Sequence, residues 1–212
     1  MNKIVYVAIS ILILMGLLYF VNSSSVNQVE AAQQNVSLSA TVQEYLSFSI
    51  TAGGTVAFGN LTPGTLTCYN TGTVASVTTN AANGYTIGLS DGASGYNSAL
   101  VHTDTTTRIP DFVGTIAYPM FWPDVDEGTG LGISLYAADT NKESKWGTGT
   151  TVCDVNNYYA GIPQNITTAH TAPGFKSSAD TSYWSFKVAV PTTQKTGSYS
   201  GTVTFTATAV LS

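Results

Sequence analysis

The chain has 212 residues, of which only 9% are charged, and its formal net charge at neutral pH is −5. Because ordinary soluble domains carry about 25% charged residues, this composition is unusual for a cytosolic protein. Seven Lys and Arg residues are too few for the basic stripe that phosphate backbones require, which argues against nucleic-acid binding. A hydrophobic fraction of 43% is enough for a core, so the chain is not a disordered one. The 32 Thr, 21 Ser and 20 Gly residues favour strands and tight turns, and therefore one all-β domain.

Residues 1–31 are expected to be a targeting segment or a membrane anchor. Lys3 precedes an uncharged apolar stretch at residues 4–21. Such a stretch at the N-terminus is typical of a secretory signal peptide or of a retained transmembrane helix. Val29 and Ala31 fit the pattern before a cleavage site, so a processed chain would begin near Ala32. With either outcome we expect an extracellular or cell-surface protein, attached to a membrane only if residues 4–21 are retained.

The two cysteines, Cys68 and Cys153, are spaced too far apart for a CxxC redox or zinc motif. In an oxidising compartment the expected outcome is one disulfide. The bond would join two distant stretches of the chain.

Apolar residues alternate with polar ones along much of the chain after residue 33, which predicts β-strands. The first alternating segment has Val36, Leu38, Ala40 and Val42 on one face, and it resumes after a phase slip at residues 46–50. Other strands are predicted at residues 55–58, 73–79, 85–89, 183–190 and 198–211. Residues 100–173 are expected to be a long irregular insertion, with short strand candidates at residues 115–118, 132–137 and 152–155. The strand number and the frequent turns predict one antiparallel β-sandwich over residues 32–212, Ig-like or jelly-roll-like in form, without a helix after residue 31.

Two blocks of the sequence resemble a known group of proteins. They are NGYTIGLSD, from Asn83 to Asp91, and VAVPTTQKTGSYSGTVTFTAT, from Val188 to Thr208. Together they are similar to exported bacterial surface β-sandwich domains of the WxL-like and pilin-like kinds. The resemblance implies a β-sandwich at the cell surface. The Trp-x-Leu signature is not present, because the three tryptophans are followed two positions later by Asp124, Thr148 and Phe186. This departure counts against the peptidoglycan binding that the WxL family implies.

Candidate catalytic and metal-binding residues are few. His102 and His170 are the only histidines, and the sequence contains no GxSxG, HExxH, P-loop or GxGxxG motif. No catalytic residue and no required cofactor are therefore predicted. An acidic loop with Asp124, Asp126 and Glu127 is a weak candidate for Ca²⁺. The alternative is that this loop is simply solvated, and the position of the bidentate Glu of an EF-hand is occupied by Leu135.

Aromatic residues gather in the predicted insertion. Aromatic rings on the loops of a sandwich can stack on sugars, so possible glycan contacts are Trp122, Trp146, Tyr158 and Tyr159. The alternative is that these side chains form a second small core beneath the long loops. N-glycosylation sequons lie at Asn22, Asn35, Asn60 and Asn165, and they matter only in a source that has the modifying enzymes.

The sequence favours a non-enzymatic structural protein of the cell surface, such as a subunit of a filament, pilus-like fibre or envelope layer. The expected partner is another copy of the chain or another surface protein. The possible strand donor comprises Val36, Leu38, Ala40 and Val42, which could add to an open sheet edge of a neighbour. Alternatively, this segment pairs within its own domain. The second function considered is an adhesin or carbohydrate- or cell-wall-binding module, and a small secreted hydrolase is the third.

Overall fold

The computed structural model of the chain describes residues 10–11, 15, 33–91 and 100–211. Its regular structure after residue 33 is β-strand apart from two short 3₁₀ turns, and its strand pairs are antiparallel, which confirms the predicted all-β class. The predicted N-terminal segment falls almost wholly outside the described residues. Among the residues that are described, none belongs to a helix long and apolar enough to cross a membrane.

The described strands and turns follow one another in short segments separated by loops. In chain order they are β1 (Leu46–Ala52), β2 (Leu66–Thr79), β3 (Tyr85–Ser90), β4 (Leu100–His102), β5 (Arg108–Ile109), β6 (Met120–Phe121), η1 (Val125–Glu127), β7 (Gly130–Ala138), η2 (Ser144–Trp146), β8 (Tyr158–Tyr159), β9 (Thr167–Ala172), β10 (Lys176–Ala189), β11 (Tyr199–Ser200) and β12 (Thr204–Ala209).

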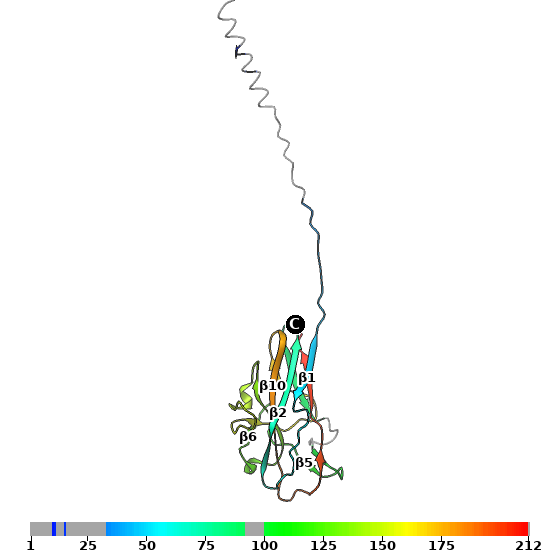
Figure 1. The fold of residues 1–212 in the computed structure, drawn as a ribbon, viewed down its shortest axis with the longest axis vertical. Coiled ribbons are helices and arrows are strands. Elements are labelled where there is room, and N and C mark those ends of the chain that lie inside the picture. Colours follow the sequence, from blue (N-terminus) through cyan, green and yellow to red (C-terminus); the bar gives the residue numbers. More distant parts are fainter. Residues whose placement is uncertain (1–9, 12–14, 16–32, 92–99, 212) are drawn as a thin grey trace, which may run out of the picture. The chain divides into compact units, whose positions relative to one another are not determined.

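Two sheets contain most of the paired residues. Sheet A has the strand order β1-β2-β10-β7, and β1, β2 and β10 can be followed side by side in Figure 1. Sheet B has the order β12-β3-β9. Two smaller sheets pair β11-β4-β5 and β6-β8. In both large sheets, strands far apart in the sequence are neighbours, as β2 and β10 are, so the fold depends on long-range pairing.

The main core contains residues from both large sheets. Val77 of β2 and Trp184 of β10 belong to sheet A, whereas Ile87 and Leu89 of β3 belong to sheet B, and all four are buried in one cluster. The alternation of apolar and polar residues places these side chains on one face of each strand. Burial of this shared apolar surface holds the two sheets together.

The turn before β3 requires glycine. Gly84 has a φ of +83°, and a Cβ atom there would collide with the carbonyl oxygen of Ala172 at the end of β9. Only glycine adopts this backbone conformation without strain and allows the neighbouring strand to come so close. The Asn83-Gly84 pair therefore sets where β3 begins.

The structure differs from the predicted strands in several places. Residues 36–42 and 55–58 form no strand. Residues 115–118 form a turn instead, in which Thr115 and Tyr118 exchange backbone hydrogen bonds. Residues 152–155 bend at Cys153, whose φ is +63°. The long C-terminal strand is split into β11 and β12, and the short strands β4, β5, β6, β8 and β9 were not predicted.

The predicted disulfide is confirmed. Cys68 in β2 is bonded to Cys153, which lies in the insertion, and their Cα atoms are 5.9 Å apart. By its contacts the chain divides after Val42, and residues 43–212 form one unit that contains all the strands and the disulfide.

Candidate functional site

Residues 33–42 are an exposed segment without secondary structure, which we call the donor segment. Its apolar side chains are uncovered, and that of Leu38 is 92% exposed. Ser37, Ser39 and Thr41 alternate with the apolar residues, so in an extended conformation one face of the segment is apolar and the other carries hydroxyls. None of its residues is charged. Such a segment has the pattern of a half-buried strand, yet within the described residues it has no strand partner.

The three residues that follow the donor segment are held in place by the end of β2. Asn80 accepts a hydrogen bond from the backbone N–H of Tyr45 through its side-chain oxygen, at 2.6 Å. Its amide nitrogen donates to the carbonyl oxygen of Gln43, at 2.7 Å. The hydroxyl of Thr79 and the backbone N–H of Asn80 both donate to the carbonyl oxygen of Tyr45. These bonds extend the attachment of β1 back to Gln43.

One edge of sheet B is capped by the insertion. On β9, the N–H of Thr171 donates to the carboxylate of Glu143 and its carbonyl oxygen accepts from the amide of Asn141. The indole N–H of Trp146 donates to the carbonyl oxygen of Ala169. Although burial alone would raise it, hydrogen bonding and attraction to His170 hold the pKa of Glu143 below its ordinary value.

The β7 edge of sheet A is covered as well. Ile133 exchanges backbone hydrogen bonds with Ala160, and Leu131 bonds to the backbone of Pro110 and Phe112. The first six residues of β7 are buried. A strand from another molecule could therefore not reach this edge without displacing the insertion.

The other edges of the two sheets are open in the described part of the chain. They belong to β1 and β12, which are in contact with each other. Their core-facing residues, such as Phe48 on β1 and Phe205 on β12, are only partly buried, whereas Val77 and Ile87 on the neighbouring strands are buried. This side of the core is therefore incompletely covered.

A pocket of about 330 Å³ lies where β1 ends and β12 begins. Its apolar lining includes Ile50, Val56, Phe58, Val203 and Phe205, and none of the described residues that line it is charged. We call this pocket, together with the open edges of β1 and β12, the β1–β12 seam. In Figure 1 the blue β1 lies beside the red C-terminal strand.

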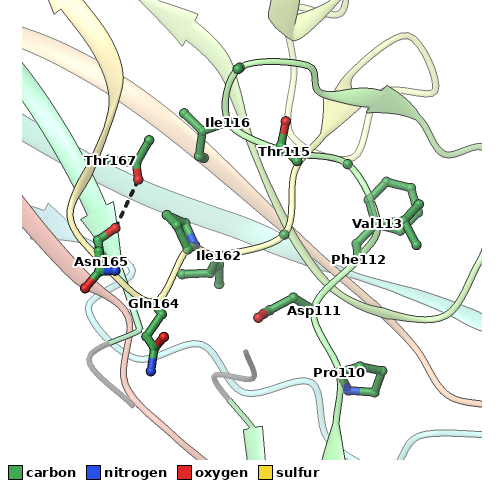
Figure 2. A pocket seen from close by; sticks show the side chains of 14 residues that line it. Pro110, Asp111, Phe112, Val113, Thr115, Ile116, Ile162, Gln164, Asn165 and Thr167 are labelled. Atoms are coloured by element: carbon green, nitrogen blue, oxygen red, sulfur yellow. Dashed lines mark hydrogen bonds between the residues drawn. The ribbon is translucent and has the colours of Figure 1, made fainter. Parts of the chain in front are cut away.

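A larger pocket, of about 670 Å³, lies between residues 110–117 and residues 161–167 (Figure 2). Ile116 and Ile162 contribute apolar surface, and among the described residues that line it only Asp111 is ionisable. The hydroxyl of Thr167 donates to the carbonyl oxygen of Asn165. The described lining therefore offers neither a pair of carboxylates nor a histidine next to a nucleophile, two common catalytic arrangements of hydrolases.

The two histidines lie apart from both pockets. His170 pairs with Glu143 at 3.1 Å through Nδ1, and its buried Nε2 has no hydrogen-bond partner among the described residues. His102 contacts Asp104 at 3.2 Å, and a hydrogen bond from Lys195 is the main cause that holds the pKa of Asp104 well below its usual range. Each histidine therefore has a carboxylate partner, and within the described part of the chain neither is hydrogen-bonded to a Ser, Thr or Cys side chain.

The acidic loop that was the candidate Ca²⁺ site makes contacts of its own. In the described part of the chain, no three acidic, histidine or cysteine side chains are grouped closely enough to hold a metal ion. Asp124 instead caps η1, since its carboxylate accepts the backbone N–H of Asp126 at 2.9 Å. Glu127 shares a hydrogen bond with Asp124, which is the main cause that raises its pKa. The alternative of a solvated acidic loop fits these contacts.

Three of the four predicted glycan contacts are wrong. Trp122, Trp146 and Tyr159 are buried, so their rings cannot stack on a sugar. Each polar group has an internal partner, namely the carbonyl oxygens of Gly128 and Ala169 and the hydroxyl of Ser185. Trp and Tyr are readily buried when their N–H or O–H is satisfied. Trp122 and Tyr159 pack in a second, smaller core, which was the alternative, whereas Trp146 belongs to the main core.

Tyr158, the fourth predicted glycan contact, is exposed and forms an aromatic pair with Phe121, which is exposed as well. The rings of Tyr158 and Phe121 meet edge to face at 6.1 Å across the β6-β8 pair. Tyr118, 80% exposed, precedes β6. The sequon residues Asn35, Asn60 and Asn165 are exposed, which glycosylation would require. Their glycosylation stays a prediction.

Lys187 is a buried cation that the strand pattern did not reveal. Its Nζ donates to the carbonyl oxygen of Trp122 at 3.1 Å and lies 4.5 Å from the centre of the Tyr159 ring. Burial lowers the pKa of Lys187, and burial raises the pKa of Tyr159 to about 12. The cation–π contact offsets part of the cost of removing the ammonium from water.

We expect the protein to lose stability between about pH 10 and pH 12 in part through Tyr159. In the unfolded chain a tyrosine releases its proton near pH 10, whereas folded Tyr159 keeps it to about 12. The folded state then binds more protons, so stability falls with rising pH, by about 2–3 kcal/mol for this group. Urea unfolding at several pH values tests this, with Tyr159→Phe as the variant that should lose less. Equal alkaline losses in both proteins would contradict it.

Comparison of the chain with known protein families, with curated proteins and with solved structures finds no match.

Proposed function

We propose that the protein is a non-enzymatic structural subunit of the cell surface that assembles by strand addition. In this proposal sheets A and B pack as a β-sandwich, which their shared core supports. The donor segment of one copy becomes an additional strand in the next copy. Because the contact joins two different surfaces of the chain, repetition gives a filament rather than a closed dimer.

The exposure of the donor segment carries the proposal. Val36, Leu38 and Val42 are each more than 80% exposed, and they lie on one face of the alternating pattern. Fully burying such a side chain contributes roughly 1.5–3 kcal/mol. Strand addition would bury the three together and also give the backbone of the segment, which forms no strand among the described residues, a hydrogen-bonding partner.

The remaining features suit an extracellular polymer. The disulfide is of the kind that persists in oxidising compartments. The low charge reduces repulsion between copies that lie close together.

The test is to replace one apolar residue of the donor segment and to measure assembly. Leu38→Asp is expected to abolish filaments seen by negative-stain electron microscopy and to leave monomers in sedimentation, since a carboxylate cannot enter an apolar core unpaired. Ser39→Asp is the matched control, because it adds the same charge on the opposite face and should keep most of the assembly. Leu38 and Ser39 are both exposed, so neither substitution should unfold the domain. Filaments formed by Leu38→Asp would refute the proposal.

The second candidate is a glycan-binding adhesin, favoured by the exposed aromatic pair of Phe121 and Tyr158. A wild-type protein that stays monomeric in the same sedimentation experiment and binds a glycan array would support this function instead. Binding should then be lost in Phe121→Ala but kept in Val155→Ala, a change at another exposed apolar residue.

A further inference from the structure

We infer that the β1–β12 seam is the acceptor site for the donor segment of a second copy of the chain. This inference rests on the proposed function and names the surface that it needs. The occupant is residues 36–42, with Val36, Leu38 and Val42 directed into the core and Ser37, Ser39 and Thr41 directed to solvent.

Sheets A and B have four outer edges, and a comparison of their hydrogen bonding identifies the seam as the acceptor site. The outer edge of β9 is occupied by Glu143, Asn141 and Trp146, and that of β7 by the backbone of the insertion. The outer edges of β1 and β12 have no strand partner in the described part of the chain. Of the four outer edges of sheets A and B, and within the described residues, those of β1 and β12 are the two at which an incoming strand can pair without first breaking the hydrogen bonds described above.

The seam also provides an apolar surface against which the apolar face of the donor segment can pack. Ile50 at its margin is 36% exposed, and Phe48 and Phe205 are only partly buried although they face the core. The pocket between the two strands is lined without charge, and the donor segment is uncharged too. Filling this side of the core would therefore desolvate no ionised group among the described residues of the pocket, which makes the contact favourable.

The attachment of residues 43–45 favours a second copy over the same chain. To fold back onto its own β1 or β12, the donor segment would have to reverse direction within these residues. Their backbone is bonded to Thr79 and Asn80, so a turn there would break those bonds. The donor segment of another molecule can dock with all of them intact.

A complementation experiment with purified protein tests the acceptor. Leu38→Asp removes the donor but keeps the seam, whereas Gly54→Asp places a carboxylate in the seam but keeps the donor. A Cβ at Gly54 meets only Ile50 Cγ2, at 3.8 Å, and Gly54 is not in a left-handed conformation, so the backbone tolerates this change. Each variant alone should sediment as a monomer. Their mixture should give a one-to-one complex that grows no further, because each chain then supplies only one half of the contact.

The outcomes separate this inference from the proposed function. If Leu38→Asp is monomeric but Gly54→Asp still forms filaments, the seam is not the acceptor although strand donation stands. If Leu38→Asp itself forms filaments, the proposed function fails. Val113→Asp, in the larger pocket of Figure 2, should assemble normally, and its failure to assemble would move the acceptor there. Should near-UV circular dichroism show that Gly54→Asp is unfolded, Thr202→Asp places the charge on the other side of the seam.

Discussion

Replacement of both Cys68 and Cys153 by serine is expected to lower the free energy of unfolding by about 4–5 kcal/mol, the value that the loop-entropy model gives for a loop of roughly 85 residues. The two cysteines are 85 positions apart in the sequence, so the bond removes a large part of the freedom of the unfolded chain. Small domains have a total stability of roughly 5–15 kcal/mol. The loss would therefore leave the protein marginally folded or unfolded at physiological temperature.

The bond also holds the insertion against sheet A. The backbone N–H of Cys153 points to the hydroxyl of Ser185 on β10, which in turn contacts the hydroxyl of Tyr159. Without the bond, the loop that carries Cys153 is expected to move first. Guanidinium unfolding of the wild type and the double-serine variant measures the change, and reduced wild type is the control that should match the variant. A loss below about 1 kcal/mol in both would show that unfolded-state entropy is not the main contribution of this disulfide.

The sequence predicted the parts of the fold in which apolar core residues alternate with small or polar ones. Residues 85–89 and 183–190 alternate because one face of each strand packs in the core shared by the two sheets and the residues between are mostly small or polar, although nearly all of them are buried. The start of β10 shows why the rest was missed. Residues 176–179 lie at the exposed end of sheet A. They are small or polar on both faces of the strand, so the sequence shows no alternation of apolar and polar residues there.

The donor segment shows the opposite case. Residues 36–42 have the alternation of a strand, but in the single chain they form none. Alternation of apolar and polar residues indicates that a segment can form a β-strand, but it does not indicate which strand it pairs with. An alternating segment that stays unpaired is the pattern expected for a strand whose partner belongs to another molecule.

The capping of β9 was beyond sequence analysis for a different reason. Glu143, Asn141 and Trp146 precede β9 by more than twenty residues, in a region without a regular pattern. Their roles depend on how the insertion folds over the sheet. The buried tryptophans were misjudged in the same way, since only the structure shows the carbonyl oxygens that accept their indole N–H groups.

Trp184→Ala is expected to destabilise the protein by about 3–5 kcal/mol, the usual cost of removing a buried tryptophan from a core. The side chain is fully buried in the core that joins the two sheets. Its ring meets those of Trp146 and Phe205 edge to face, at 6.0 and 5.4 Å. Its indole N–H donates to the hydroxyl of Ser182 at 2.9 Å, so the substitution also leaves that hydroxyl without its donor.

Tyr183→Ala is the matched control for Trp184→Ala. Tyr183 is the preceding residue of β10, lies on its other face and is partly exposed beside Tyr136. Its loss should cost much less, about 1 kcal/mol, because removing it leaves no closed cavity. Urea unfolding of both variants gives the comparison, and equal losses would contradict the assignment of Trp184 to the central core. Because Phe205 belongs to β12 and lines the seam, Trp184→Ala should also weaken assembly at protein concentrations where the domain is still folded.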